Sequence, residues 1–550
     1  MVQTQLKKLG LEEAHADEYD AIVVGGGMTG ANVLLYLASR GLRVILVEKG
    51  DIASGTSGMS TKLVHGGLRY LQQYQFGVTL ESVRERQILS RLAPHMVWSL
   101  PFVIPMYANE RWKNLKITAG LWIYDLMAGL PNPEFHKRIS AAEVMQMCPG
   151  VRSDLLVGGL VYSDCRTDDA RHTLEVIKAA CAYGATALNY TRAKKFHKID
   201  GRVREVDVVD ALAGPDAPTV RLRGRVVINA TGVWSERITE LSGSTSKMGV
   251  VAAKGVHLML SQKRLPISCA MILPSPHGDG RFCFAVPWYN VIIVGTTDTA
   301  YDGDIEHVRG KTEEFQYCLD AVNAMFPDAN VTLADIQGKI AGLRPLVRAK
   351  NASGSTAALA RSHHLEETAE GLIIIDGGKL TTARIMAEDT GDLVVKALLR
   401  QDPMRDIPRS RTDRIMLGGW NLSDNVPQRM LESEKVALWI GLTAETAKYL
   451  PTVYGAATSQ VLMLAQAQKE LRQLIAADHP YILAQVIYAV REEAARTIDD
   501  VLSRRIRLSI TDKRAARAAA DNVSRVMAEE LRWSESKRLL ELMAFAMSID

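Results

Sequence analysis

The sequence predicts an α/β fold in which a Rossmann-like domain is interleaved with an antiparallel-sheet domain and is followed by an all-α C-terminal domain. Three observations predict it: a glycine-rich turn between an apolar strand and a helix near the N-terminus, alternating strands in the middle of the chain, and helical spacing after about residue 420. The length of 550 residues predicts two to four domains, since a typical domain has roughly 100 to 200 residues.

The strongest local pattern is a βαβ unit at residues 20–48. Residues 21–24 and 44–47 are apolar runs typical of buried parallel strands, and residues 28–39 have helical spacing. Gly25, Gly27 and Gly30 form a G-x-G-x-x-G turn, in which they permit a tight turn, close approach of a pyrophosphate and close helix packing, respectively. Glu48 ends the second strand, where a carboxylate accepts hydrogen bonds from ribose hydroxyls. The unit therefore predicts a dinucleotide site.

Later segments predict how the two sheets alternate along the chain. Residues 225–229 and 372–375 are apolar runs before small-residue turns, so we expect them in the parallel sheet, whereas residues 282–287 and 290–295 suit an antiparallel sheet. The dinucleotide-binding parts are expected at about 19–100, 155–250 and 335–400 within residues 19–420, and the substrate-binding parts at about 100–155 and 250–335. Residues 421–550 are expected to form the helical domain, with helices at 482–502 and 513–531.

Composition excludes several classes of protein. Hydrophobic residues make up 47% and charged residues 23% of the chain, which excludes fibrous and disordered proteins, and a net charge of +4 gives no support to nucleic-acid binding. The six cysteines lack C-x-x-C spacing, so we expect neither a disulfide framework nor a metal site. No apolar run reaches the roughly 18 residues of a membrane-spanning helix. Because residues 1–20 also lack a signal-peptide pattern, we expect a cytoplasmic protein.

A long segment of small residues follows the βαβ unit at residues 50–71. Its Ser, Thr and Gly residues fit a backbone that lies against an extended, flat cofactor, and the alternative is a solvated surface loop. With the motifs that follow, it resembles the FAD-dependent glycerol-3-phosphate dehydrogenases of the glycine-oxidase-like flavoprotein superfamily. The resemblance runs in order from about residue 19 to 535. It is carried by VVGGGMTG (23–30), SGTSGMSTKLVHGGLRYLQQ (54–73), YSDCRTDDAR (162–171), NATGVW (229–234), KGVH (254–257), VGTTD (294–298), GLRPL (342–346), GGKLTT (377–382) and AARTIDDVL (494–502).

The resemblance implies that the first domain is a Rossmann-like FAD-binding domain. The implied FAD contacts lie in the first turn, at the end of the second strand, in the small-residue segment and in three later turns. They are Gly25, Gly27, Met28, Thr29, Gly30, Glu48, Lys49, Ser60, Thr61, Lys62, Leu63, His65, Gly66, Gly67, Ala230, Thr231, Gly232, Gly342, Gly378, Lys379, Leu380 and Thr381.

The resemblance also implies oxidation of sn-glycerol 3-phosphate to dihydroxyacetone phosphate. FAD holds the redox chemistry, so the protein must orient and deprotonate the alcohol. Planar guanidinium groups suit a phosphate, and an imidazole titrates near neutral pH. The residues expected to bind substrate are Arg69, Tyr70 and Arg361, and those expected to act in catalysis are Arg344, Lys379, His65 and His257.

Other functions remain open at this point. The chain departs from the family pattern at Asn32 and Leu35 in the first helix, at Ala383, and at the pair Gly58 and Met59. The last three lie in segments expected near flavin and substrate, so another polyol phosphate, such as a tetritol phosphate, is an alternative substrate. An oxygen-using glycerophosphate oxidase and a non-enzymatic dinucleotide-binding module are further alternatives.

One segment suggests contact with a membrane. Residues 111–124 combine basic residues with Trp112 and Trp122 along an apolar stripe, which is typical of an interfacial helix. The alternative is a core helix with a charged end. Because the respiratory members of the family reduce membrane quinone, we expect peripheral attachment to the inner face of the cell membrane through Trp112, Lys113, Lys116 and Trp122. The resemblance also allows a homodimer.

Overall fold

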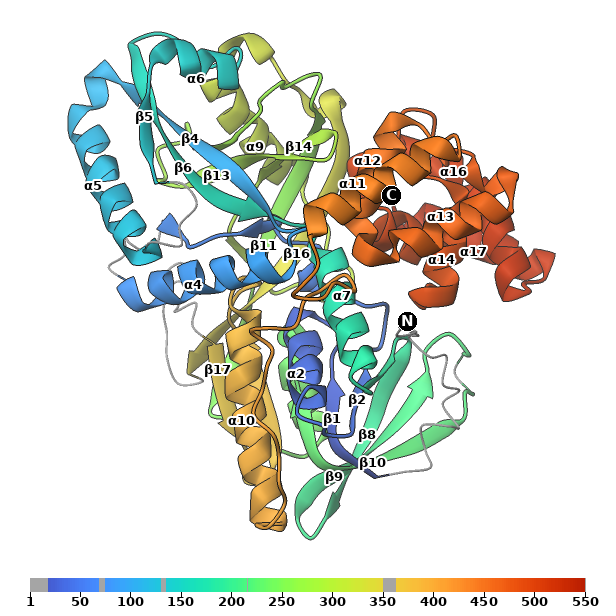
Figure 1. Ribbon diagram of the computed structural model, residues 1–550. Coiled ribbons are helices and arrows are strands. Elements are labelled where there is room, and N and C mark those ends of the chain that lie inside the picture. The colour runs from blue at the N-terminus through green and yellow to red at the C-terminus, as the bar shows by residue number, and fades with distance from the viewer. Residues whose placement is uncertain (1–17, 69–74, 130–134, 215, 350–362, 550) are drawn as a thin grey trace.

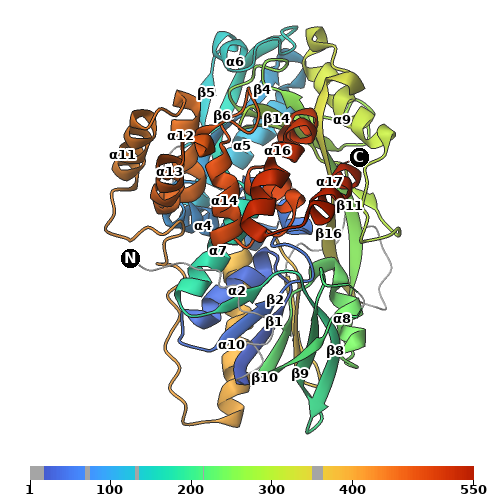
Figure 2. The same ribbon diagram turned by 90° about the vertical axis from the view of Figure 1, so that its right-hand side faces the viewer.

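The computed structural model describes residues 18–68, 75–129, 135–214, 216–349 and 363–549. The chain forms two sheets and a helical C-terminal domain, which lies beside the second sheet in Figures 1 and 2. The predicted α/β fold with a helical C-terminal domain is confirmed.

The first sheet contains the parallel strands expected from the apolar runs. Its order is β17-β18-β10-β1-β2-β7, and Ala21 in β1 pairs with Val226 on one side and Val44 on the other. β8 and β9 extend from β10 as an antiparallel meander. The strands are β1 (Glu18–Val24), β2 (Val44–Val47), β7 (Thr186–Leu188), β8 (Thr191–Ile199), β9 (Arg202–Asp210), β10 (Thr219–Asn229), β17 (His363–Glu367) and β18 (Leu372–Gly377).

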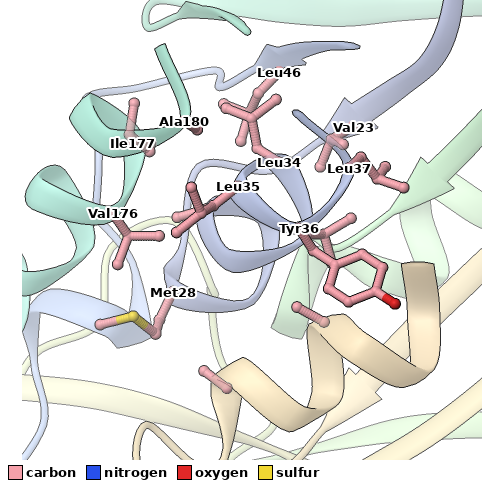
Figure 3. Close-up of a cluster of buried hydrophobic side chains, with 14 of the residues drawn as sticks. Val23, Met28, Leu34, Leu35, Tyr36, Leu37, Leu46, Val176, Ile177 and Ala180 are labelled. Carbon is pink, nitrogen blue, oxygen red and sulfur yellow. The ribbon is translucent and has the colours of Figure 1, made fainter. Parts of the chain in front are cut away.

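Helices cover one face of the first sheet and the meander covers the other. α2 (Met28–Ala38) packs between α7 (Asp169–Ala182) and α10 (Ala383–Gln401). Its Leu34 and Leu37 are fully buried in one cluster with Val23 and Leu46 of the strands, as Figure 3 shows. A helix buried nearly all round needs apolar residues on every side, which explains why α2 carries no charged residue.

The second sheet is mostly antiparallel and has the order β15-β11-β14-β13-β12-β4-β6-β3, with β16 paired to β11 and β5 to β6. α6 (Ala141–Met147) and α9 (Thr312–Met325) pack on it, and α4 (Phe76–Leu92) and α5 (Arg111–Ala128) lie between the sheets and at their side (Figure 1). The strands are β3 (Leu63–Val64), β4 (Trp98–Tyr107), β5 (Lys137–Ile139), β6 (Leu156–Arg166), β11 (Met248–Ser261), β12 (Ala270–Pro274), β13 (Phe282–Trp288), β14 (Val291–Gly295), β15 (Thr299–Ala300) and β16 (Ile336–Ala349).

Two of the expected boundaries between the sheets are wrong. Strands β6 and β16 were expected in the FAD-binding parts, but β6 pairs with β4 and β16 pairs with β11, so both lie in the second sheet. Short β3 also pairs with β6. The reason is that pairing partners are set by contacts between segments far apart in the sequence, which turn signals do not report.

One of the helices predicted in the C-terminal domain is interrupted. The helix expected at 482–502 ends at Glu492 and is followed by a bend and a π-helical turn, Asp500–Arg505. Ala494 has a left-handed φ of 52°, and the Asp500 carboxylate accepts hydrogen bonds from the N–H groups of Arg496 and Thr497. The helices are α11 (Val426–Trp439), α12 (Ala444–Tyr454), α13 (Thr458–Ala467), α14 (Leu483–Glu492), α15 (Leu508–Thr511), α16 (Lys513–Leu531) and α17 (Glu535–Ser548).

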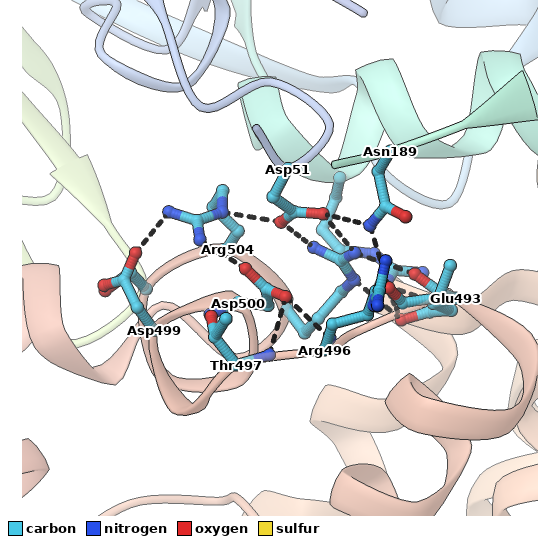
Figure 4. A network of polar contacts seen from close by, with 12 residues as sticks. Asp51, Asn189, Glu493, Arg496, Thr497, Asp499, Asp500 and Arg504 are labelled. Atoms are coloured by element: carbon cyan, nitrogen blue, oxygen red, sulfur yellow. Dashed lines mark hydrogen bonds and ion pairs between the residues drawn. The ribbon is translucent and has the colours of Figure 1, made fainter. Parts of the chain in front are cut away.

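Buried ion pairs join the C-terminal domain to the first domain. The carboxylate of Asp51, which follows β2, binds the guanidinium groups of Arg504 and Arg505 at 2.6 and 2.7 Å. Arg171 in α7 binds Glu493 at 2.7 Å. Figure 4 shows the Asp51 part of this network, in which side chains from both domains converge. Because a buried charge is tolerated only when it is paired, these contacts fix how the two domains meet.

Candidate functional site

A cavity of about 2030 Å³ is lined by residues from both sheets. It takes in the carboxyl ends of the parallel strands, where open α/β sheets place their ligands. Most of the residues predicted to bind a cofactor lie in its wall, where the N–H of His65 donates to Thr381 Oγ1 at 3.2 Å. The predicted residues in the wall are Gly25, Gly27, Met28, Thr29, Glu48, Lys49, Ser60, Thr61, Leu63, His65, Gly67, Ala230, Thr231, Gly232, His257, Gly342, Arg344, Gly378, Lys379, Leu380 and Thr381.

The glycine turn is required by close packing at one end of the cavity. Gly25 has a φ of 115°, and a Cβ there would lie 2.6 Å from the carbonyl oxygen of Ala230. A Cβ at Gly30 would lie 2.0 Å from the carbonyl oxygen of Gly25, so Gly30 lets α2 approach the turn. Gly30 is absent from the cavity wall, and its part is therefore to pack the helix. The turn leaves the N-terminus of α2 facing the cavity, where an anion is favoured.

Ser57 joins this end of the site, although the sequence analysis did not single it out. Its Oγ accepts a hydrogen bond from the Met28 N–H at 2.8 Å and so occupies one donor of the α2 N-terminus. No side chain of the turn itself caps the helix. The sequence could not single out Ser57 from the other small residues of its loop, because its hydrogen-bond partner lies 29 positions away.

Glu48 lies beside the glycine turn. Its carboxylate accepts hydrogen bonds from the N–H groups of Gly26 at 2.6 Å and Gly50 at 2.9 Å. Burial raises the pKa of Glu48, and the two backbone donors oppose that shift. The carboxylate is therefore held rigidly at the end of β2, in the position expected for a ribose contact.

Lys62 and Gly66 were predicted to contact a cofactor, but they lie outside the cavity wall. The Lys62 ammonium is fully buried and binds both carboxylate oxygens of Asp169 at 2.9 Å. A Cβ at Gly66 would lie 2.2 Å from the hydroxyl oxygen of Tyr124, so this glycine makes room for a neighbouring ring. The prediction is therefore corrected for the Lys62 side chain, because its charge is used to pair a buried carboxylate.

Arg344 supplies a cation to the wall of the cavity. Its guanidinium donates to Thr296 Oγ1 at 2.9 Å, to Asp298 Oδ1 at 3.2 Å and to the Thr297 carbonyl at 3.2 Å. A Cβ at Gly255 would lie 2.5 Å from its Nη2, so Gly255 gives the guanidinium its space. Thr296 and Asp298 belong to the VGTTD motif at 294–298, which the sequence analysis noted without assigning them a role.

His257 and Thr61 form a hydrogen-bonded pair at the same part of the wall. The His257 Nε2 and Thr61 Oγ1 are 2.9 Å apart. Burial, with the nearby cations Lys62 and Arg344, lowers the pKa of His257 to about 3. The ring is therefore uncharged at neutral pH and is a weak proton acceptor there, which leaves hydrogen bonding as its role.

Lys379 follows two glycines at the end of β18. Gly377 and Gly378 have φ values of 76° and 75°, a conformation that strongly favours glycine. The turn places Lys379 in the cavity wall, where its Nζ donates to Ser82 Oγ of α4 at 3.2 Å. Arg69, Tyr70 and Arg361, the predicted substrate-binding residues, lie outside the described residues.

Asp376, which directly precedes the turn at Gly377 and Gly378, is a buried carboxylic acid. Asp376 Oδ2 accepts a hydrogen bond from Ser235 Oγ at 3.0 Å, while its Oδ1 has no hydrogen-bond partner among the described residues. Burial, with the charges of Glu236 and Glu366 nearby, raises the pKa of Asp376 to about 7, and the Ser235 hydrogen bond opposes that shift. Its neighbours Ile375 and Gly377 both line the cavity.

Comparisons with known proteins agree with this geometry. Residues 20–393 match the FAD dependent oxidoreductase family, and residues 410–538 match the C-terminal domain of alpha-glycerophosphate oxidase. The chain is 37% identical to glycerol-3-phosphate dehydrogenase 2 of Mycobacterium tuberculosis over 96% of its own length and 86% of that protein. It is 35% identical to the aerobic glycerol-3-phosphate dehydrogenase of Bacillus subtilis over 94% of its own length and 92% of that protein.

A solved structure also matches the whole chain. The glycerol-3-phosphate dehydrogenase from Bacillus halodurans complexed with FAD superposes with a TM-score of 0.81 and 30% identity, covering 100% of this chain and 98% of that one.

We predict that Asp376→Asn stabilises the protein at neutral pH. A carboxyl whose folded pKa is raised keeps its proton in the native state, so native stability falls as pH rises from about 4 to about 7 and then levels off. The Asn side chain of the variant does not ionise, so this fall in native stability with pH is absent. The variant should gain stability over the wild type by at most about 1.4 kcal/mol per pH unit across that window, measured as midpoints of urea unfolding.

Asp389→Asn is the matched control, because Asp389 is exposed on α10 and pairs with His363 at 2.9 Å. It should show no such gain. Equal unfolding midpoints for Asp376→Asn and wild type at pH 7 to 8 would show that Asp376 is ionised without cost in the native state.

Proposed function

The chain belongs to the family of FAD-dependent oxidoreductases that contains the glycerol-3-phosphate dehydrogenases, and on this premise we propose that it oxidises sn-glycerol 3-phosphate to dihydroxyacetone phosphate. FAD is its cofactor. The proposal is carried by one observation: a single cavity joins the glycine turn and Glu48 to a region that contains Arg344, His257 and Lys379.

The residues present fit FAD. The backbone of Gly25 to Thr29 and the N-terminus of α2 would hold the pyrophosphate, and Glu48 would accept the ribose hydroxyls. A Cβ at Gly25 would clash with the Ala230 carbonyl and a Cβ at Gly30 with the Gly25 carbonyl, so either change would displace the turn that forms this cradle. When bound, FAD accepts the hydride that leaves the substrate carbon.

The remaining steps fall to side chains of the cavity wall. Arg344, oriented by Thr296 and Asp298, provides a fixed guanidinium for the substrate phosphate or the developing alkoxide. His257 is held neutral and offers a hydrogen bond. We assign removal of the hydroxyl proton to His65, with Lys379 stabilising the negative charge on that oxygen.

We further propose that the electrons pass to a quinone in a membrane, and that α5 is the helix that contacts this membrane. Residues three and four apart lie on one face of a helix, and Trp112, Leu115, Trp122 and Leu126 form such a stripe with exposed fractions of 79, 60, 65 and 82%. The alternative of a core helix therefore does not hold for this face. A stripe of exposed Trp and Leu fits the headgroup region of a bilayer.

The neighbouring face of α5 reaches the cavity. Lys116, Ile117, Gly120 and Ile123 all line it, so an apolar acceptor held at the surface stripe would be adjacent to the site. Lys116 is exposed and adds a cation, whereas the Lys113 side chain lies outside the described part of the chain. Within the described residues, no helix combines the length and the hydrophobicity required to traverse a bilayer.

Arg344→Ala tests the substrate assignment. Loss of a charge-assisted bond worth about 1.5 to 3 kcal/mol should lower kcat/KM for glycerol 3-phosphate by roughly 10- to 150-fold, and further if the site rearranges. The visible flavin spectrum should persist, because Arg344 is not one of the residues assigned to the FAD pyrophosphate or ribose.

The control is Arg348→Ala, on the same strand but outside the cavity wall, which should retain wild-type kinetics. Unchanged kcat/KM in Arg344→Ala would remove Arg344 from the substrate site.

The double change Trp112→Ser and Leu126→Ser tests the membrane surface. Removing two exposed apolar side chains should weaken cosedimentation with anionic phospholipid vesicles by about tenfold or more, and slow quinone reduction. Activity with a soluble dye acceptor should be unaffected. Trp439→Ser, which removes a 77% exposed Trp from α11, is the control and should sediment like wild type. If the double variant cosediments with the vesicles as strongly as the Trp439→Ser control and the wild type, the membrane attachment lies on another surface or is absent.

A further inference from the structure

The segment between β15 and α9 crosses from the second sheet to the first domain. Its ends are fixed to the second sheet: the Tyr301 N–H donates to the Ala252 carbonyl at 3.1 Å, and Lys254 Nζ donates to the Arg309 carbonyl at 3.3 Å. Asp304 shapes the middle by accepting the Glu306 N–H at 2.9 Å. The segment therefore presents the Glu306 side chain at a defined place.

Glu306 makes three polar contacts with the first domain. Both of its carboxylate oxygens accept hydrogen bonds from Lys49 Nζ, and the shorter of these two bonds is 2.5 Å. The carboxylate also accepts a hydrogen bond from Trp234 Nε1 at 2.9 Å. The Arg237 guanidinium lies 3.5 Å away. Lys49 Nζ also lies 4.0 Å from the centre of the Trp234 ring, so the cation is held between a carboxylate and an aromatic face. We call this set of four residues the Glu306 bridge.

The Glu306 bridge lies at the end of the cavity where Glu48 is found. All four of its residues belong to the cavity wall, and Lys49 directly follows Glu48. Trp234 ends the small-residue turn that begins at Ala230, and a Cβ at Gly55 would lie 3.1 Å from its ring. The bridge therefore joins the two domains across the part of the cavity that receives the ribose.

We propose that Glu306 is a positioning residue for the cofactor: it holds Lys49 and Trp234 across the ribose end of the cavity, and FAD leaves after this bridge opens. The side chains of Lys49 and Glu306 are 35 and 37% exposed, so water and salt reach the pair. Such a contact is weak enough to open and close repeatedly, yet it raises the barrier to release of a bound molecule. FAD retention does not depend on which alcohol the enzyme oxidises.

The test is the rate of FAD release from the holoenzyme, followed as the rise in flavin fluorescence after dilution at low and high KCl. Glu306→Gln keeps the shape and removes the charge. It should release FAD about three- to tenfold faster than wild type at low salt. Release from the wild type should accelerate with KCl, whereas release from the variant should respond much less, because the screened pair is already gone. Lys49→Gln should behave in the same way.

Glu535→Gln is the matched control, since the exposed Glu535 pairs with Arg538 on α17 at 2.7 Å. It should release FAD like wild type. The melting temperature of each apoprotein distinguishes an effect on FAD retention from an effect on folding stability. For Glu306→Gln we expect faster FAD release and an unchanged apoprotein melting temperature. Equal release rates for Glu306→Gln and wild type, equal salt responses, or a lower apoprotein melting temperature without faster release would each overturn it.

Discussion

The carboxylate of Asp169 is the contact on which the rest of the structure depends. It lies at the start of α7, is fully buried, and accepts hydrogen bonds from Ser60, Lys62 and Arg507 at 2.7 to 2.9 Å. Burial alone would raise its pKa, but Lys62 and Arg507 lower it. Removing one partner of a buried pair costs roughly 3 to 5 kcal/mol. A single charge therefore holds together α7, the C-terminal domain and the segment that lines the cavity.

The form of the cavity follows from this constraint. With Lys62 turned toward Asp169, the segment presents Ser60, Thr61 and Leu63 to the cavity instead of a cation. Thr61 meets His257 from the second sheet, and Ser57 meets the N-terminus of α2 from the first. None of the described residues of the C-terminal domain lies in the cavity wall, but through Arg507 and the Asp51 pairs this domain fixes the segment that does line it. Its part is thus to position the site rather than to form it.

The sequence predicted the features that depend on local spacing. The glycine turn, the strands at 21–24 and 44–47, and the helix at 513–531 all form, because periodicity and glycine placement are properties of neighbouring residues. It could not assign β6 and β16 to their sheet or foresee the pairing of Lys62, since these depend on partners that are distant in the sequence. It also could not place the bend after Glu492, which depends on the buried carboxylate of Asp500. Glu306 was missed for the same reason: its contact with Lys49 spans 257 positions.

The proposed function requires one cavity to hold FAD at one end and a phosphorylated alcohol at the other. The most direct measurement is the visible spectrum of the purified protein before and after anaerobic addition of sn-glycerol 3-phosphate, with glycerol as the comparison. The account predicts flavin absorption that bleaches with glycerol 3-phosphate and persists with glycerol. Bound flavin that keeps its absorption with saturating glycerol 3-phosphate would contradict it.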